Sequence, residues 1–135
     1  MTESIKRHEI LLGGPNEQKF GLARAVRVGR FICVGGTAPI AEDGSNVRPG
    51  DIAAQVARCY EIIGAALAKA GASPKDVTRT RTMLVRIEDA PAAIAARLAF
   101  LKGTMSVDTI VQVAGFLDPD WLVEIEADAI VVADE

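Results

Sequence analysis

Hydrophobic and polar positions alternate most regularly near the end of the chain, over residues 122–132. Five apolar positions fall on one face of an extended strand, namely Val123, Ile125, Ala127, Ala129 and Val131. The intervening positions carry three carboxylates, Glu124, Glu126 and Asp128. Because successive side chains of a strand point to opposite faces, this spacing predicts a strand with one packed face and one acidic face.

Two segments have the spacing of amphipathic helices. The first follows Pro49-Gly50, with Asp51 as its N-cap, and Gly71 stops it. Its apolar positions recur at helical intervals, at Ile52, Val56, Tyr60, Ile63 and Leu67.

The second predicted helix begins near Asp89 and ends at Lys102-Gly103. Pro91 is tolerated there because the first turn of a helix does not need its N–H groups. The apolar stripe expected to pack on the sheet consists of Ile94, Leu98 and Leu101.

Further apolar runs predict strands over residues 20–28, 30–34, 77–87 and 108–116. Gly29 predicts a hairpin between the first two, and Gly35-Gly36 is typical of a turn. The order is therefore strands, helix, strand, helix and two strands. It predicts one α+β domain over residues 1–135, a sandwich with two helices on one face of a mostly antiparallel sheet.

The other face of this sheet is expected to be mixed in character. If Thr80, Thr82 and Leu84 pack under the helices, then Arg79, Arg81 and Met83 share the open face with the three carboxylates. Apolar groups and opposite charges on one face suggest contacts between subunits. The alternative is a solvated face with scattered apolar residues.

Composition narrows the function classes. Half of the 135 residues are hydrophobic, 4% are aromatic and the formal net charge is −3. Such a chain lacks the basic footprint and the aromatic platform of a nucleic-acid-binding protein. No stretch approaches the ~20 apolar residues of a membrane span. Cys33 and Cys59 are expected to be buried free thiols, which suits a reducing cytoplasm.

Few residues stand out as chemical candidates. His8 is the sole histidine and is interpreted as a solvated or edge-strand residue, and there is no metal-ligand cluster. Glu124, next to the turn at residues 118–121, is placed to orient a water or transfer a proton. Arg24 and Arg27 can receive a carboxylate ligand, although simple ion pairs explain these charges equally well.

Three segments together resemble the Rid/YjgF family of reactive-intermediate deaminases. They read ARAVRVGRFICVGGTAPIAEDG, GDIAAQVARCYEIIGAALAKAGASPKDVTRTRTMLV and VDTIVQVAGFLDPDWLVEIEADAIVV. The resemblance covers nearly the whole chain from residue 20 onward. It implies a chorismate-mutase-like fold and a homotrimer with ligand sites in clefts between subunits. It also implies hydrolysis of imines or enamines to carbonyl compounds and ammonia, without metal or organic cofactor.

Carried over position by position, the family's water-positioning glutamate falls on Glu124. Its Ser-Gly pair falls on Gly35-Gly36, and its site tyrosine falls near Leu22. Its substrate-binding arginine falls on Asp108, and the cysteine two residues beyond falls on Ile110. An aspartate repels a carboxylate by on the order of several kcal/mol in a partly buried cleft, which argues against activity on 2-aminoacrylate. Candidates for a displaced cation are Arg24, Arg86 and Arg97.

These features leave three hypotheses for function. The first is a divergent Rid-family trimer that hydrolyses an imine, enamine or related C–N bond of a small polar metabolite. The second is a non-catalytic ligand-binding or chaperone-like member. The third, a ribonuclease or translation inhibitor, is disfavoured by the acidic charge and the scarce aromatic residues. In each case Glu124 is expected at the cleft, with Glu126 and Asp128 paired to Arg79 and Arg81.

Overall fold

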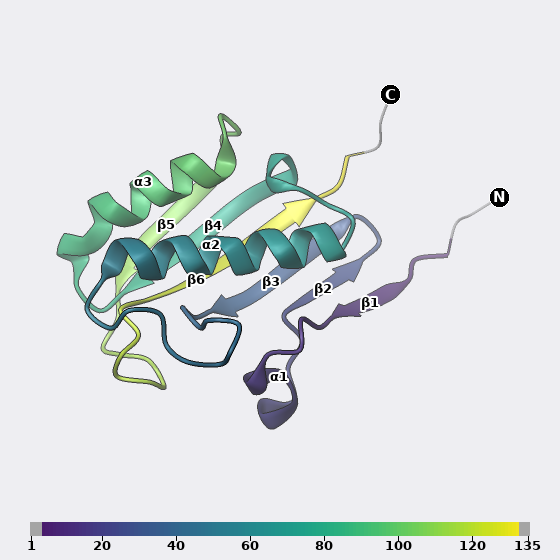
Figure 1. Cartoon of the computed structure of the whole chain (residues 1–135). Coiled ribbons are helices and arrows are strands. Elements are labelled where there is room, and N and C mark those ends of the chain that lie inside the picture. The colour runs from purple at the N-terminus through teal and green to yellow at the C-terminus, as the bar shows by residue number, and fades with distance from the viewer. Residues whose placement is uncertain (1–3, 133–135) are drawn as a thin grey trace.

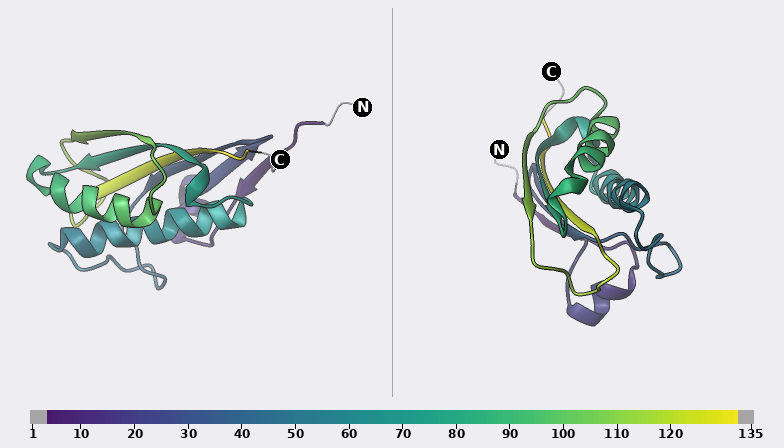
Figure 2. Two further views of the ribbon diagram at one scale, coloured as in Figure 1. Left: turned by 90° about the horizontal axis from the view of Figure 1, so that it is seen from above. Right: turned by 90° about the vertical axis from the view of Figure 1, so that its left-hand side faces the viewer.

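A computed structural model describes residues 4–132, which form a curved six-stranded sheet with two long helices on one side (Figures 1 and 2). The strand order is β1-β2-β3-β6-β4-β5, and only β4 and β5 run parallel. The strands are β1 (Arg7–Ile10), β2 (Ala25–Val28), β3 (Phe31–Thr37), β4 (Val77–Leu84), β5 (Val107–Gln112) and β6 (Val123–Ile130). This confirms the predicted α+β class with a mostly antiparallel sheet.

The helices are α1 (Pro15–Phe20), α2 (Ile52–Lys69) and α3 (Ala90–Leu101), with short 3₁₀ turns at Pro74–Asp76 and Ile87–Asp89. The Asp51 side chain accepts a hydrogen bond from the Ala54 N–H and caps α2 as predicted. Gly71 follows the end of α2 with a φ of +85°, which a glycine adopts without strain. The right-hand view of Figure 2 shows α2 and α3 on the same side of the sheet.

The core lies between α2 and the central strands. Val56, Ile63 and Leu67 of α2 are fully buried, as are Val123 and Ile125 of β6. The predicted alternation on β4 is also confirmed, since three of its residues are buried beneath the helices, Thr80, Thr82 and Leu84. The carboxylates of β6 consequently share the open face with the arginines of β4.

The hairpin between β2 and β3 forms as predicted. Val28 pairs with Phe31, so the loop has two residues, and Gly29 at its first position has a φ of +60°. Glycine at this position is the signature of a type II′ turn, whose twist matches the flanking strands.

The predicted strand over residues 20–28 is wrong in its first half. Phe20 closes the short helix α1, and Gly21 caps it in the left-handed conformation, with a φ of +66°. The strand starts only at Ala25. In front of α1 lies an edge strand, β1, which pairs with β2 and for which no strand was predicted. It carries His8, so the interpretation of this histidine as an exposed edge-strand residue is confirmed.

Three strand ends also differ from prediction. The strand predicted over residues 77–87 stops at Leu84, and the one predicted over residues 108–116 spans Val107–Gln112. In contrast, β3 continues beyond Val34 through Gly35-Gly36 to Thr37. The glycine pair is therefore not a turn. It lies within a strand, where the pairing with β6 shifts register.

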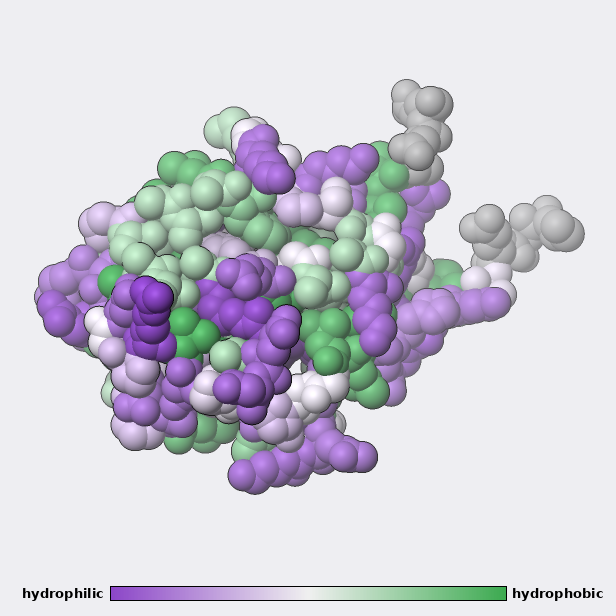
Figure 3. Space-filling model, in the orientation of Figure 1, coloured by the Kyte–Doolittle hydropathy of each residue, from purple (hydrophilic) through white to green (hydrophobic). Residues whose placement is uncertain are grey.

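The predicted apolar stripe of α3 is wrong at two of its three positions. Ile94 and Leu98 are 41% and 60% exposed, whereas Leu101 is buried. The helix contacts the core through Ala93 and Phe100 instead, because the helix is so rich in alanine that spacing alone does not define its packed side. Figure 3 accordingly shows weakly apolar surface over α3. Cys33, expected to be buried, is exposed, while Cys59 is buried as predicted.

Candidate functional site

The irregularity of β3 at Gly35-Gly36 is where the candidate side chains meet. Between Val34 and Thr37 the register with β6 shifts, as it does at a β-bulge. The Gly35 N–H donates to the carbonyl of Arg24 (3.0 Å), and the Arg24 guanidinium donates through Nη2 to the carbonyl of Gly36 (2.8 Å). The hairpin register, in which Ala25 pairs with Val34, thus brings Arg24 beside the glycine pair, and hydrogen bonds join these two predicted site segments.

The absence of a Cβ atom matters most at Gly36. A Cβ atom there would lie 3.1 Å from Oε1 of Glu124, tighter than an ordinary van der Waals contact. A Cβ atom at Gly35 would lie 3.4 Å from Nη2 of Arg24, which is an ordinary van der Waals contact. The bare backbone of Gly36 therefore leaves room for the Glu124 carboxylate, a recurrent use of glycine at sites.

Glu124 is the half-buried member of this cluster, on the open face near the start of β6. Burial raises the pKa of its carboxyl above the ordinary 4.5, since the charged form loses water. The positive charge of Arg24 acts in the opposite direction, and Glu126 raises the pKa further. A carboxyl group shifted in this direction is better matched to proton transfer near neutral pH.

Arg24 lies between two carboxylates. Its pKa is lowered by burial, while Glu17 and Glu124 oppose this shift. Its Nε is buried and has no hydrogen-bond partner among residues 4–132. Leu22, two residues earlier, is 43% exposed and lies beside Arg24 in the wall of a cavity near α1. Arg24 thus has a hydrogen-bond donor, its Nε, that is left unpaired among residues 4–132.

Asp108 is placed away from this cluster. It lies on β5, opposite the buried Thr80 of β4, and its carboxylate accepts a hydrogen bond from the Thr80 hydroxyl (2.8 Å). Arg97 of α3 approaches the same carboxylate at 3.8 Å and also donates to Thr80 and Ser106. Ile110, next on the same face of β5, packs against the core. Both residues lie on the helix-covered side of β5, away from Glu124 on the open face.

Comparison with known proteins places this geometry in context. The model of the family described as Endoribonuclease L-PSP matches residues 18–131. Rv2704 of Mycobacterium tuberculosis, described as a member of the YjgF/YER057c/UK114 family, is 33% identical in sequence. Its structure has a TM-score of 0.83, and the match covers 93% of this chain and all of that one. The chain belongs to the Rid/YjgF family.

Other relatives agree with this assignment. The uncharacterized protein SCO2049 of Streptomyces coelicolor is 31% identical over 95% of this chain and 93% of its own length. The structure of PA3499, a protein of unknown function from Pseudomonas aeruginosa, has a TM-score of 0.80. It is 26% identical, with 94% of each chain covered. These likenesses confirm the predicted chorismate-mutase-like, or YjgF-like, sandwich.

In this Rid/YjgF chain the remaining carboxylates of β6 pair as predicted. Arg81 approaches Glu126 at 3.4 Å and Asp128 at 3.8 Å, and Arg79 approaches Asp128 at 3.6 Å. Each of these side chains is at least one third exposed in the single chain. The row of three carboxylates is therefore divided into Glu124, against the glycine pair, and two ion-paired neighbours.

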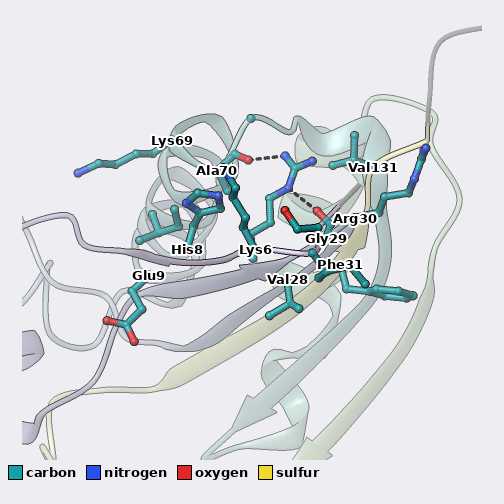
Figure 4. Close-up of a pocket in the computed structure, with 15 residues that line it drawn as sticks. Lys6, His8, Glu9, Val28, Gly29, Arg30, Phe31, Lys69, Ala70 and Val131 are labelled. Atoms are coloured by element: carbon teal, nitrogen blue, oxygen red, sulfur yellow. Dashed lines mark hydrogen bonds between the residues drawn. The ribbon is translucent and has the colours of Figure 1, made fainter. Parts of the chain in front are cut away.

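Arg27, the other arginine considered as a ligand for carboxylates, has a structural partner instead. Its guanidinium donates through Nη1 to the carbonyl of Ala70 (2.7 Å) and through Nε to the carbonyl of Gly29 (2.9 Å). Figure 4 shows these two bonds in a hollow beside β1, with His8 and Lys69 nearby. Arg27 thus satisfies a carbonyl at the end of α2, at the opposite end of β2 from Arg24.

Neither a metal cluster nor a membrane helix is found in the described part of the chain. Residues 4–132 contain no group of three or more His, Cys, Asp or Glu side chains able to hold a metal ion. No helix there is long and apolar enough to cross a membrane.

Sequence reasoning missed the cavity beside Arg24. Its wall combines α1, the loop after β3 and one side of α2. Nothing in the spacing of the sequence signals that these three segments converge, although the αL-compatible Gly21 marks the chain reversal that brings α1 back toward β2.

Proposed function

We propose that this chain forms a homotrimer that binds a small polar metabolite in clefts between subunits and hydrolyses an imine, enamine or related C–N bond. The observation that carries the proposal is the half-buried Glu124 carboxyl, raised in pKa, held against the bare backbone of Gly36. Membership of the Rid/YjgF family supports it. No metal or organic cofactor takes part in the proposed reaction.

In the proposed reaction Glu124 positions a water molecule beside the carbon of the C=N bond. With the substrate in its protonated iminium form, the carboxylate accepts a proton from this water as its oxygen bonds to carbon and the C=N π electrons move to nitrogen, which gives a neutral tetrahedral carbinolamine. Glu124 then returns that proton to nitrogen, the C–N bond breaks with its electron pair leaving on ammonia, and the carboxylate takes the hydroxyl proton as the carbonyl forms. An enamine enters the same path after protonation at carbon. No net oxidation or reduction occurs.

Arg24 is assigned the role of a positioning residue. It fixes the Gly36 carbonyl and lies close enough to favour the ionised form of Glu124. Of the three arginines considered as displaced cations, Arg97 is occupied by Asp108, Thr80 and Ser106, and Arg86 lies on an exposed turn. With Asp108 in the place of the family arginine, we expect 2-aminoacrylate to be a poor substrate.

The trimer is supported by the character of the open face. Val28 and Phe31 are 39% and 63% exposed at one end of it, and Val107 and Val111 are 59% and 42% exposed at the other. Between them lie the ion pairs of Arg79 and Arg81. Apolar groups flanking paired charges are typical of surfaces that become buried on association.

A ligand-binding member without catalysis is the second candidate, favoured by Asp108 in place of the family arginine. Ribonuclease activity, which the name of the matching family suggests, is disfavoured here by the net charge of −3 and the 4% aromatic content. Cytoplasmic localisation fits the free thiols and belongs to this proposal.

The test measures ammonia released from imines that an amino-acid oxidase generates in situ, with the uncatalysed rate subtracted. Glu124→Gln should lower kcat/KM by roughly a hundredfold or more, as loss of an acid-base group does. Glu88→Gln, the same change at an exposed position, should leave the rate unchanged. Ammonia release that is equal in Glu124→Gln and the parent chain would remove Glu124 from the mechanism. Absence of release from every imine would favour the non-catalytic alternative.

A further inference from the structure

The turn that leads into β6 is held by a buried amide. Gln55, in the first turn of α2, is fully buried. Its Oε1 accepts the N–H of Leu122 (2.8 Å), and its Nε2 donates to the carbonyl of Asp120 (2.9 Å). Leu122 is the last residue before β6, two positions before Glu124. Gln55 therefore fixes the backbone from which the strand of Glu124 starts.

The loop after β3 is attached to the same turn. Nε2 of Gln55 also donates to the carbonyl of Val47 (3.2 Å). Asn46, the neighbouring residue, accepts the indole N–H of Trp121 (2.8 Å) and donates to the carboxylate of Asp118 (3.1 Å). The loop that leaves β3 and the turn that enters β6 are thus joined through one buried side chain and its neighbours.

One helical turn further along α2, Cys59 holds the other strand of the site. Its Sγ donates to the carbonyl of Thr37 (3.2 Å), the residue that follows the glycine pair, and the Thr37 hydroxyl donates to the carbonyl of Gly35 (2.8 Å). Burial raises the pKa of the Cys59 thiol, so it stays protonated and remains a donor. Because positions i and i+4 share a helix face, Gln55 and Cys59 reach β6 and β3 from the same side. Figure 1 shows α2 lying over both strands.

The space between these two strands is narrow at Glu124. A Cβ atom on Gly36 would come within 3.1 Å of its carboxylate, so the carboxylate lies against the backbone of β3. The charged groups that face it are Arg24, just before β2, and Glu126, further along β6, which is itself paired with Arg81 of β4. A displacement of the start of β6 relative to β3 would change this contact and the access of water to the carboxyl.

We propose that Gln55 and Cys59 are positioning residues, which set from the helix side of the sheet how closely Glu124 lies against Gly36. Both act through the backbone of the two strands, since their own side chains are buried between α2 and the sheet. The placement of the carboxyl follows from this packing alone, whereas any effect on hydrolysis rests on the proposed function.

A measurement independent of catalysis is the pKa of Glu124, followed by ¹³C NMR of the full chain labelled at its glutamate carboxyl groups. Glu124→Gln identifies the resonance. Gln55→Met removes the amide at similar side-chain length and should shift the pKa of Glu124 toward the ordinary 4.5, because the carboxyl regains water. Leu67→Ala, at a fully buried position near the other end of α2, should lower the melting temperature without moving this pKa. A pKa that is the same in Gln55→Met and the parent would overturn the proposal.

Cys59 allows a conservative exchange. Cys59→Ala loses the bond to the Thr37 carbonyl and should shift the pKa of Glu124 in the same direction as Gln55→Met. Cys59→Ser keeps a donor at this position and should retain the parent value. These two variants test the proposal even if Gln55→Met fails to fold in a thermal melt. Equal pKa values of Glu124 in Cys59→Ala, Cys59→Ser and the parent would overturn it as well.

The imine-hydrolysis assay supplies a second readout. Gln55→Met should lower kcat/KM by roughly tenfold or more, because misplacing a catalytic group by about 1 Å is enough for such a loss. In the Glu124→Gln background the same change should lower it by less than about twofold, since a positioning residue acts only through the group that it positions. A loss of equal size in both backgrounds would contradict the positioning role. If the parent hydrolysed no imine while the pKa of Glu124 still responded to Gln55→Met, the proposed function would fail and the positioning would stand.

Discussion

At the scale of single residues, Gly36 and Glu124 lie against each other. A Cβ atom on Gly36 would come within 3.1 Å of the Glu124 carboxylate, and the strand continues past Gly35 with a local shift of register. The Glu124 carboxyl is partly removed from water in this position, which disfavours its charged form. The nearby positive charge of Arg24 offsets this effect only in part, since the pKa of Glu124 is still raised. The chain thus keeps a carboxyl group whose ionised form its surroundings disfavour.

This raised pKa makes a prediction about stability. The folded-state pKa of Glu124 exceeds its unfolded value, so the protonated group favours folding at low pH. That contribution is lost as pH rises through the folded-state pKa. Glu124→Gln, which is always neutral, should be slightly more stable than the parent at pH 7, with the difference fading as the pH falls below 4.5. Urea unfolding at both pH values measures this.

A Glu124→Gln chain that is less stable at pH 7 would contradict the prediction. It would mean that the attraction between Glu124 and Arg24 outweighs the cost of burial. Glu88→Gln again serves as the control, since an exposed carboxylate should give the same small difference at both pH values.

At the scale of secondary-structure elements, a largely buried ion pair joins α3 to β5. Asp108 and Arg97 have side chains only 16% and 13% exposed, and Thr80 and Ser106 complete their hydrogen bonding. A buried charge is tolerated only when paired in this way. The pair of Asp108 and Arg97 therefore holds α3 onto the edge strand β5.

Breaking this pair should destabilise the fold. Asp108→Leu leaves Arg97 without its carboxylate and should cost about 2–4 kcal/mol of unfolding free energy. The double change Arg97→Met with Asp108→Leu should recover most of the loss, because no unpaired charge stays buried. Glu9→Gln, which removes an exposed pair with Arg7, should cost less than about 0.5 kcal/mol. If Asp108→Leu and Glu9→Gln lowered the unfolding free energy equally, the pair of Asp108 and Arg97 would contribute no more than an exposed pair.

At the scale of the whole molecule, the two faces of the sheet differ in what covers them and in the side chains that they carry. One is covered by α2 and α3, as Figure 2 shows, and the other carries charged pairs bordered by exposed valine and phenylalanine side chains. Leaving the apolar side chains of this face in water costs free energy, and association would bury them. This is the basis of the proposed trimer.

Light scattering on the purified chain should therefore give about three times its mass of 14.3 kDa. Arg81→Glu places a third acid beside Glu126 and Asp128, so repulsion on the open face should shift the protein toward monomers. Arg48→Glu makes the same change of charge at a side chain 79% exposed on the helix side, and it should leave the mass unchanged. A stable monomer of the parent chain would defeat the trimer.

Much of the fold follows from local patterns. The alternation of β6, the cap at Asp51 and the glycine of the β2–β3 loop each depend on a few neighbouring residues, and each was predictable. The α3 helix shows the limit of prediction from local patterns. Its many alanines satisfy more than one packing arrangement, so the buried side was decided by contact with α2 and β4, not by the spacing of Ile94 and Leu98.

The site divides in the same way. The sequence alone determined that Glu124 lies on the open face of a strand. Only the tertiary structure decided that Gly35-Gly36 lies inside a strand, that Arg24 reaches across it, and that Asp108 is occupied by Arg97. The physical reason is that the face a side chain occupies is a local property of its strand, whereas its partner is set by which distant segments the packed core brings together.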